Sequence, residues 1–178
     1  MVIIEVLTAE DHLVEQVLNC LEKVVARCET GSTMDRESVR EVLDFLRQFA
    51  DPCHPADGEE PLFPSRDRHG LPRQGGPTSV ALKEHDRGRK HDRAMTAAVA
   101  AAAAGDFAAQ YVFLKHATAY VRGLRAYLKK HDYSIFPMAD RLLTDTEDQL
   151  LPTAFDGVEP DDMGEGLYKH PLRLTDAR

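Results

Sequence analysis

The chain has 178 residues, 43% of them hydrophobic and 29% charged, which suits one soluble domain with its own core. A net charge of −8 without a basic stripe argues against nucleic acid as a partner, and no apolar run reaches the roughly 20 residues that span a bilayer. The first residues have no basic region typical of a signal peptide, and the three cysteines form no C-x-x-C pair, so we expect a cytoplasmic protein with reduced thiols.

Two helices are predicted in the first part of the chain. Heptad-like apolar spacing predicts a helix over 8–28, with Thr8 as its N-cap. Gly31 breaks this helix, and a second apolar face over 39–49 predicts the next one. Prolines and glycines are frequent over 55–77, so we expect an irregular segment there that ends as a surface loop.

Two further long helices are predicted after this segment. The third covers 77–104 and ends at Gly105, and Asp106 caps a fourth helix that reaches about residue 142. So short a connection makes these two helices antiparallel neighbours. A short fifth helix is expected over 147–155, followed by an acidic tail.

With four amphipathic helices and no credible strand, the predicted fold class is all-α, an antiparallel up-down four-helix bundle. We expect the bundle to occupy residues 1–145, and residues 146–178 to hold the short helix and the acidic C-terminal tail.

Ionisable residues interrupt the apolar stripes that should face the bundle axis. They come from every predicted helix: Asp11 with His12 on its flank, His54, His85, Asp92, and then His116, Tyr120, Tyr127 and His131. Buried ionisable groups need partners or a metal. Bundles hold di-iron and di-manganese centres with imidazole and carboxylate ligands from facing helices. The pattern therefore predicts a metal site, although each residue also has a structural interpretation.

A single inward histidine is more often a hydrogen-bonded core residue than a ligand. We expect His69, His91 and His170 to lie on the surface. Asp11 could serve only the dipole of the first helix, and Tyr120 is expected to pack in the core.

Four ordered segments of the chain resemble the hemerythrin-like (HHE cation-binding) domain family, together covering about residues 5–145. They read EVLTAEDHLVEQVLNCLE at 5–22, FADPCHPADGEEPLFP at 49–64, VALKEHDRGRKHDRAM at 80–95 and YVRGLRAYLKKHDYSIFPMADRLL at 120–143. The resemblance implies a bundle in which each ligand helix offers a histidine, and two helices offer an H-x-x-x-E pair whose glutamates bridge two irons.

Two of the implied metal ligands, His54 and His85, match family histidines as they stand. In the first helix the ungapped comparison puts Asp11 at the position of the family histidine, and His12 is one residue after that position. The choice between Asp11 and His12 stays open, because it depends on whether the helix is shifted by one residue.

The glutamate positions of the family have changed. The one in the second helix falls on Gly58, for which Glu59, or less readily Glu60 or Asp57, would substitute. In the fourth helix Tyr127 stands at the histidine position and His131 at the glutamate position. All the replacements other than Gly58 can bind metal, so the resemblance implies a rewired site.

The expected cofactor is iron, with two ions as the first expectation and one iron or one zinc as the alternative. A tyrosinate is a hard anionic donor that favours Fe(III), which argues against reversible dioxygen carriage. The predicted function is therefore binding or transformation of a small redox molecule, either peroxide, nitric oxide or dioxygen, at iron. As an enzyme it would be a peroxidase- or catalase-like or an oxidase-type oxidoreductase. The alternatives are a non-catalytic oxygen-sensing, redox-sensing or iron-binding module, and a degenerate bundle with a single metal.

Overall fold

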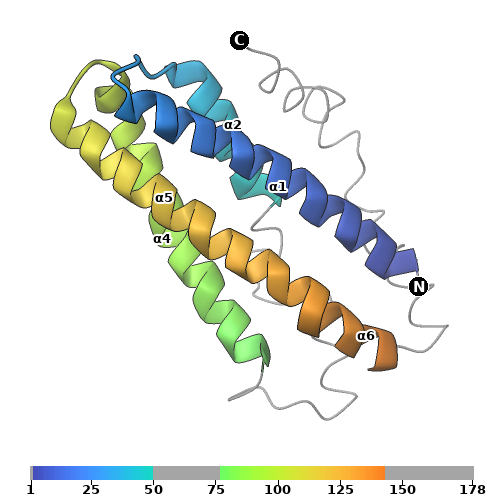
Figure 1. The fold of residues 1–178 in the computed structure, drawn as a ribbon. Helices are drawn as coiled ribbons and strands as arrows, with labels where there is room; N and C mark the ends of the chain where they lie inside the picture. Colours follow the sequence, from blue (N-terminus) through green and yellow to red (C-terminus); the bar gives the residue numbers. More distant parts are fainter. Residues whose placement is uncertain (1, 50–76, 143–178) are drawn as a thin grey trace.

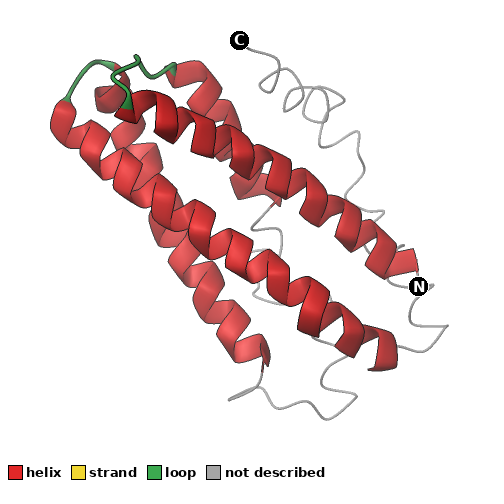
Figure 2. Ribbon diagram, viewed as in Figure 1, coloured by secondary structure: helices red, strands yellow, loops and turns green. Residues whose placement is uncertain are grey.

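The computed structural model describes residues 2–49 and 77–142, and every regular element in these two ranges is a helix (Figure 2). The predicted all-α fold is confirmed. The predicted domain boundary at 145, the fifth helix and two predicted ligands, His54 and Glu59, lie outside the described residues.

The described helices form an up-down bundle (Figure 1). Their bounds are α1 Val2–Glu29, α2 Arg36–Phe49, α4 Pro77–Ala103 and α5 Phe107–Lys130, after which the π-helix η1 His131–Ile135 and α6 Phe136–Leu142 continue the line of α5. Each of the four long helices packs on two neighbours, in the order α1, α2, α4, α5 and back to α1. Figure 1 shows both short connections at one end of the bundle, and the start of α1 near α6 at the other end.

The two short connections use glycines in the left-handed region. Gly31 follows α1 with φ 84°, and Gly105 follows α4 with φ 92°. Residues with a Cβ rarely adopt such positive φ angles, because the Cβ clashes with the backbone. Asp106 Oδ1 then accepts the backbone N–H groups of Ala108 at 2.8 Å and Ala109 at 3.1 Å. The predicted stop at Gly105 and cap at Asp106 are therefore confirmed.

The predicted start of the first helix is wrong, because α1 begins at Val2 and Thr8 lies inside it. No proline or glycine precedes Thr8, so nothing stops the helix from extending toward the N-terminus. Glu5 already places an acidic side chain in the first turn, where the helix dipole favours it.

The apolar core lies between the four long helices. Its largest fully buried side chains come from all four of them and are Leu18, Leu21, Leu43, Leu46, Met95 and Phe113. Cys20 and Cys28 are free thiols in this core, and burial raises the pKa of both. In the described ranges, no helix combines the length and the apolarity needed to cross a membrane.

Candidate metal centre

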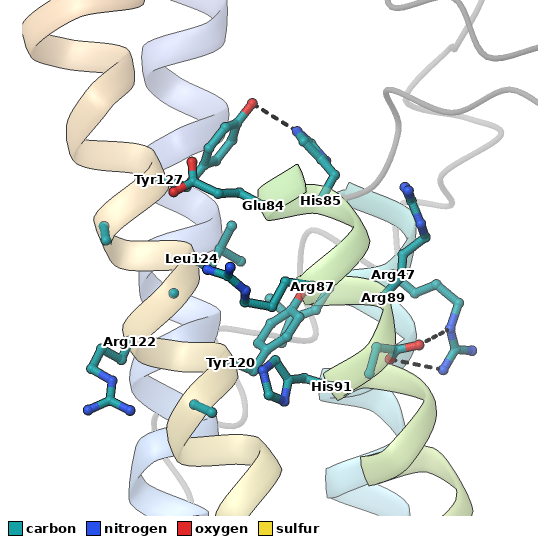
Figure 3. A pocket seen from close by; sticks show the side chains of 16 residues that line it. Arg47, Glu84, His85, Arg87, Arg89, His91, Tyr120, Arg122, Leu124 and Tyr127 are labelled. Carbon is teal, nitrogen blue, oxygen red and sulfur yellow. Dashed lines mark hydrogen bonds and ion pairs between the residues drawn. The ribbon is translucent and has the colours of Figure 1, made fainter. Parts of the chain in front are cut away.

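Two predicted ligands meet between α4 and α5. His85 Nε2 lies 2.9 Å from the hydroxyl oxygen of Tyr127, and the two rings meet edge to face with their centroids 4.9 Å apart (Figure 3). His85 is half-buried and Tyr127 is buried at 7% exposure. Two donors bound to one ion at about 2.1 Å, about 90° apart, are separated by about 3 Å. The spacing of these two atoms therefore suits adjacent positions on a metal.

Small residues leave open space beside this pair. A cavity of about 350 Å³ lies along α4 and α5 and is lined by His85 and Tyr127 together with Gly88, Ala119 and Gly123. A Cβ at Gly123 would meet no atom within 4 Å. The cavity can therefore admit a small molecule next to the His85–Tyr127 contact.

Glu84 also lines this cavity, and the sequence analysis missed it. Its Oε1 accepts a hydrogen bond from Lys130 Nζ, which links α4 to α5 one residue before His85. Its Oε2 is buried and has no hydrogen-bond partner in the described part of the chain. An unsatisfied buried polar atom costs about 1–3 kcal/mol, and more when charged, so this oxygen requires an explanation. The sequence feature that could have indicated Glu84 is its position directly before His85, a predicted ligand.

The two candidates on α1 differ in exposure. Asp11 is half-buried, whereas His12 is exposed to solvent. This difference supports the ungapped comparison, in which Asp11 stands at the ligand position. His131 lies in η1, directly after α5, and its side chain is outside what the structure describes.

Within residues 2–49 and 77–142, no three His, Cys, Asp or Glu side chains gather closely enough to hold a metal by themselves. Tyrosine is not one of these four residue types, and the predicted His54 and Glu59 fall outside these ranges. The described residues thus contribute part of a donor set: one imidazole, one phenol and the unpartnered oxygen of Glu84. Nitrogen with hard oxygen donors is a set that suits iron.

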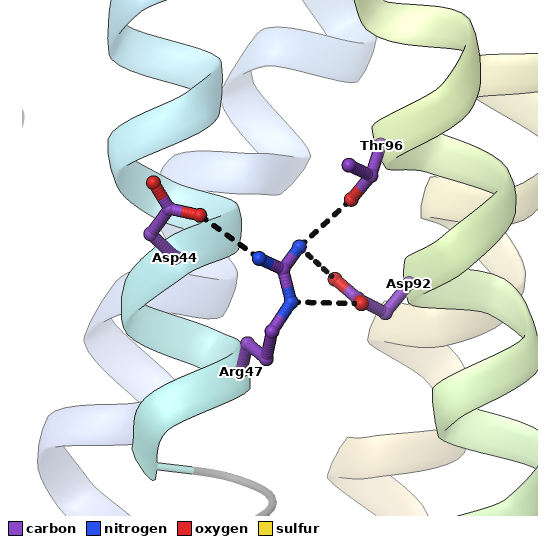
Figure 4. Close-up of polar contacts among 4 residues, drawn as sticks. All are labelled: Asp44, Arg47, Asp92 and Thr96. Carbon is purple, nitrogen blue, oxygen red and sulfur yellow. Dashed lines mark hydrogen bonds and ion pairs between the residues drawn. The ribbon is translucent and has the colours of Figure 1, made fainter.

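Asp92, predicted to share the face of His85, is held by α2 instead (Figure 4). Arg47 Nε and Nη2 donate to its two oxygens at 3.1 and 3.2 Å, and Nη2 also donates to Thr96 Oγ1 at 2.8 Å. The hydrogen bonds that Arg47 donates to Asp92 are the largest cause of the raised pKa of Arg47. Because both carboxylate oxygens are used, Asp92 serves helix packing.

The expectation that His91 is a surface residue is wrong. His91 is half-buried, and its Nδ1 lies 2.9 Å from Nδ1 of His116 on α5. Burial lowers the pKa of His91, and His116 and Arg87 lower it further. One of the two rings must therefore be the donor and the other a neutral acceptor. No spacing rule pairs these two positions, because they lie on different helices.

Comparison with known proteins identifies the family. The model of the Hemerythrin HHE cation binding domain matches residues 2–139. Uncharacterized proteins of Mycobacterium tuberculosis and Mycobacterium bovis are 24% identical to this chain over 165 residues, which is 93% of the chain and 64% of each relative. The chain therefore spans somewhat less than two thirds of the length of these relatives. No solved structure matches it.

Proposed function

We propose that this chain binds iron and that a small redox molecule reacts at that iron. The basis is that the chain belongs to the Hemerythrin HHE cation binding domain family. The ligands in this proposal are His54, His85, Tyr127 and His131, with Asp11 in preference to His12 from α1 and Glu59 as the bridging carboxylate. Two irons are the proposed content.

The single observation that carries the proposal is the contact between His85 Nε2 and the Tyr127 hydroxyl at 2.9 Å. Two residues 42 positions apart, each at a position where the family resemblance implies a ligand, point their donor atoms at one another. The pair lines a cavity of about 350 Å³, which exceeds the size of peroxide or nitric oxide. Bound iron would supply an open coordination position for that small molecule.

His85 and Tyr127 determine how many protons are released when iron binds. His85 Nε2 and the Tyr127 hydroxyl form one hydrogen bond, and the tautomer of His85 decides which of the two atoms donates. Both atoms must be free of protons to bind a metal, so iron uptake should release the Tyr127 proton to solvent. Affinity for iron should therefore rise with pH.

A phenolate donor stabilises the ferric state. This preference supports peroxide or nitric oxide as the reactant, rather than reversible dioxygen carriage. A non-catalytic oxygen-sensing, redox-sensing or iron-binding module and a single-metal bundle remain the competing functions, and each predicts a different outcome below.

The test is to load the protein with iron and mix it separately with hydrogen peroxide and with nitric oxide. The proposal predicts catalytic loss of peroxide, or a stoichiometric nitric oxide adduct, in the wild type and a strong reduction in His85→Ala. Iron that binds without either reaction supports the sensing or binding module. A protein that prefers one zinc and excludes iron contradicts the proposal.

A further inference from the structure

We propose that Glu84 is an additional metal ligand, which coordinates through its buried Oε2 while Lys130 holds Oε1. This inference rests on the proposed function, since it concerns the same site. It adds a carboxylate that neither the family resemblance nor the spacing of the sequence assigned.

The first observation is the asymmetry between the two oxygens of Glu84. Oε1 receives the ammonium group of Lys130, whereas Oε2 is buried without a partner among the described residues. A carboxylate that only tied α4 to α5 would gain nothing from burying its second oxygen. A cation on that oxygen would satisfy it.

The second observation is position. Glu84 and His85 are consecutive on α4, and their partners Lys130 and Tyr127 are three residues apart on α5. Residues three apart share a helix face, so the two contacts between the helices lie side by side. Glu84 of α4 and Tyr127 of α5 both line the cavity (Figure 3).

The Lys130 contact is compatible with this role. Carboxylates that bind metals are commonly hydrogen-bonded through outer groups, which orient them for coordination. Lys130 Nζ meets Oε1 only, and this leaves Oε2 as the coordinating atom. Four arginines, Arg47, Arg87, Arg89 and Arg122, line the cavity together with Asp92. The negative charge of Glu84 therefore offsets part of the repulsion that these arginines exert on a cation.

A carboxylate at Glu84 would also compensate for the bridging glutamate that Gly58 replaces. Iron prefers hard oxygen donors, and the described part of the ligand set otherwise offers only Tyr127 and Asp11 as such donors. A carboxylate from α4 restores a donor of the kind that Gly58 cannot provide.

The experiment is anaerobic calorimetric titration of the metal-free full chain with ferrous iron. The variants are Glu84→Gln, Glu84→Asp and Lys130→Met. The matched control is Glu15→Gln, which alters a carboxylate of α1 that pairs with Arg125 of α5, and neither residue lines the cavity. Glu84→Gln keeps the shape of the side chain and removes its charge. We expect it to weaken ferrous binding at least about tenfold, and Lys130→Met to weaken it less. Glu15→Gln should leave binding unchanged.

Thermal melting of the same metal-free variants separates coordination from a structural role. If Glu84 is a ligand, Glu84→Gln should melt close to the wild type, because an amide oxygen can still accept the hydrogen bond from Lys130, whose side chain is 44% exposed. Glu84→Asp, which keeps the charge on a shorter side chain, should fold and still bind more weakly, so the inference does not depend on one variant.

Two results would overturn the inference. Unchanged ferrous affinity in both Glu84 variants, with a loss of melting temperature equal to that of Lys130→Met, would make Glu84 a purely structural ion pair while the proposed function stands. Wild-type protein that takes up no ferrous iron would overturn the proposed function as well. The two failures are therefore distinguishable.

Discussion

Two contacts involving histidine join α4 to α5, and they have the same donor–acceptor separation in different surroundings. His85 Nε2 meets the Tyr127 hydroxyl at 2.9 Å, and His91 Nδ1 meets His116 Nδ1 at 2.9 Å. Beside the first contact, Glu84 holds a buried oxygen without a partner in the described ranges. At the second contact, burial lowers the pKa of His91 most, and the neighbouring His116 and Arg87 lower it further.

The difference teaches that the capacity to bind a cation depends on neighbouring charge more than on the histidine itself. A carboxylate oxygen attracts a cation and a guanidinium repels it, and both effects are larger in a partly buried site than in water. The His85–Tyr127 contact thus suits a metal, whereas the His91–His116 contact is a hydrogen bond that satisfies itself. The following predictions test this contrast.

The largest expected effect is on metal content. His85→Ala should lower iron per chain at least about tenfold under limiting iron, because it removes an imidazole donor of the proposed site. His91→Ala is the matched control, since it removes a half-buried histidine from the same helix. Elemental analysis of both purified variants checks this. Equal losses in the two variants would remove the contrast between the contacts.

The next effect is spectroscopic. Tyr127→Phe should remove any visible absorption that arises from phenolate bound to ferric iron, while His85 and the other donors keep some iron in place. Tyr120→Phe is the control, because Tyr120 is also buried on α5 and lines the same cavity. A visible band that survives Tyr127→Phe would show that Tyr127 is not a ligand.

A third effect concerns stability where α2 packs on α4. Arg47→Met should destabilise the fold by about 1–3 kcal/mol, because it leaves the Asp92 carboxylate, only 14% exposed, without its guanidinium partner. Chemical denaturation measures the loss. Asp44→Asn alters the more exposed partner of Arg47 and should change stability by no more than about 0.5 kcal/mol. Iron content should not change in either variant, and a loss of iron in Arg47→Met would return Asp92 to the candidate ligands.

The smallest effect is a dependence on pH. The pKa of His91 is lowered in the folded protein, so the unfolded chain binds this proton more readily and the stability contribution is lost as pH falls below about 6.5. Metal-free His91→Gln should therefore lose less melting temperature than the wild type between about pH 7.5 and about pH 5.5, by a few degrees at most. If the melting temperatures of the two proteins change equally with pH, protonation of His91 does not destabilise the fold.

Much of the fold followed from local signals that act over a few residues. Gly105 and Asp106 fixed the turn between α4 and α5, because a left-handed glycine and an N-cap carboxylate have few alternatives. The predicted start of α1 was wrong because Thr8 can cap a helix but can also lie inside one. No proline or glycine precedes Thr8 to stop the helix from extending toward the N-terminus.

Residue chemistry and family resemblance both indicated His85 and Tyr127, and the structure brings these two side chains into contact, while their role as metal ligands stays a prediction. Glu84, the pairing of His91 with His116, and the capture of Asp92 by Arg47 depend on contacts between helices. Such contacts join residues 25 to 46 positions apart, and helix periodicity gives the face of each residue but not its partner.

Metal content per chain, measured together with the visible spectrum of the protein as purified, tests the central claim most directly. The account predicts close to two irons per chain and a phenolate-to-ferric band that Tyr127→Phe removes. Protein without iron after expression in iron-supplemented medium, or iron without such a band, would contradict a metal site built on His85 and Tyr127.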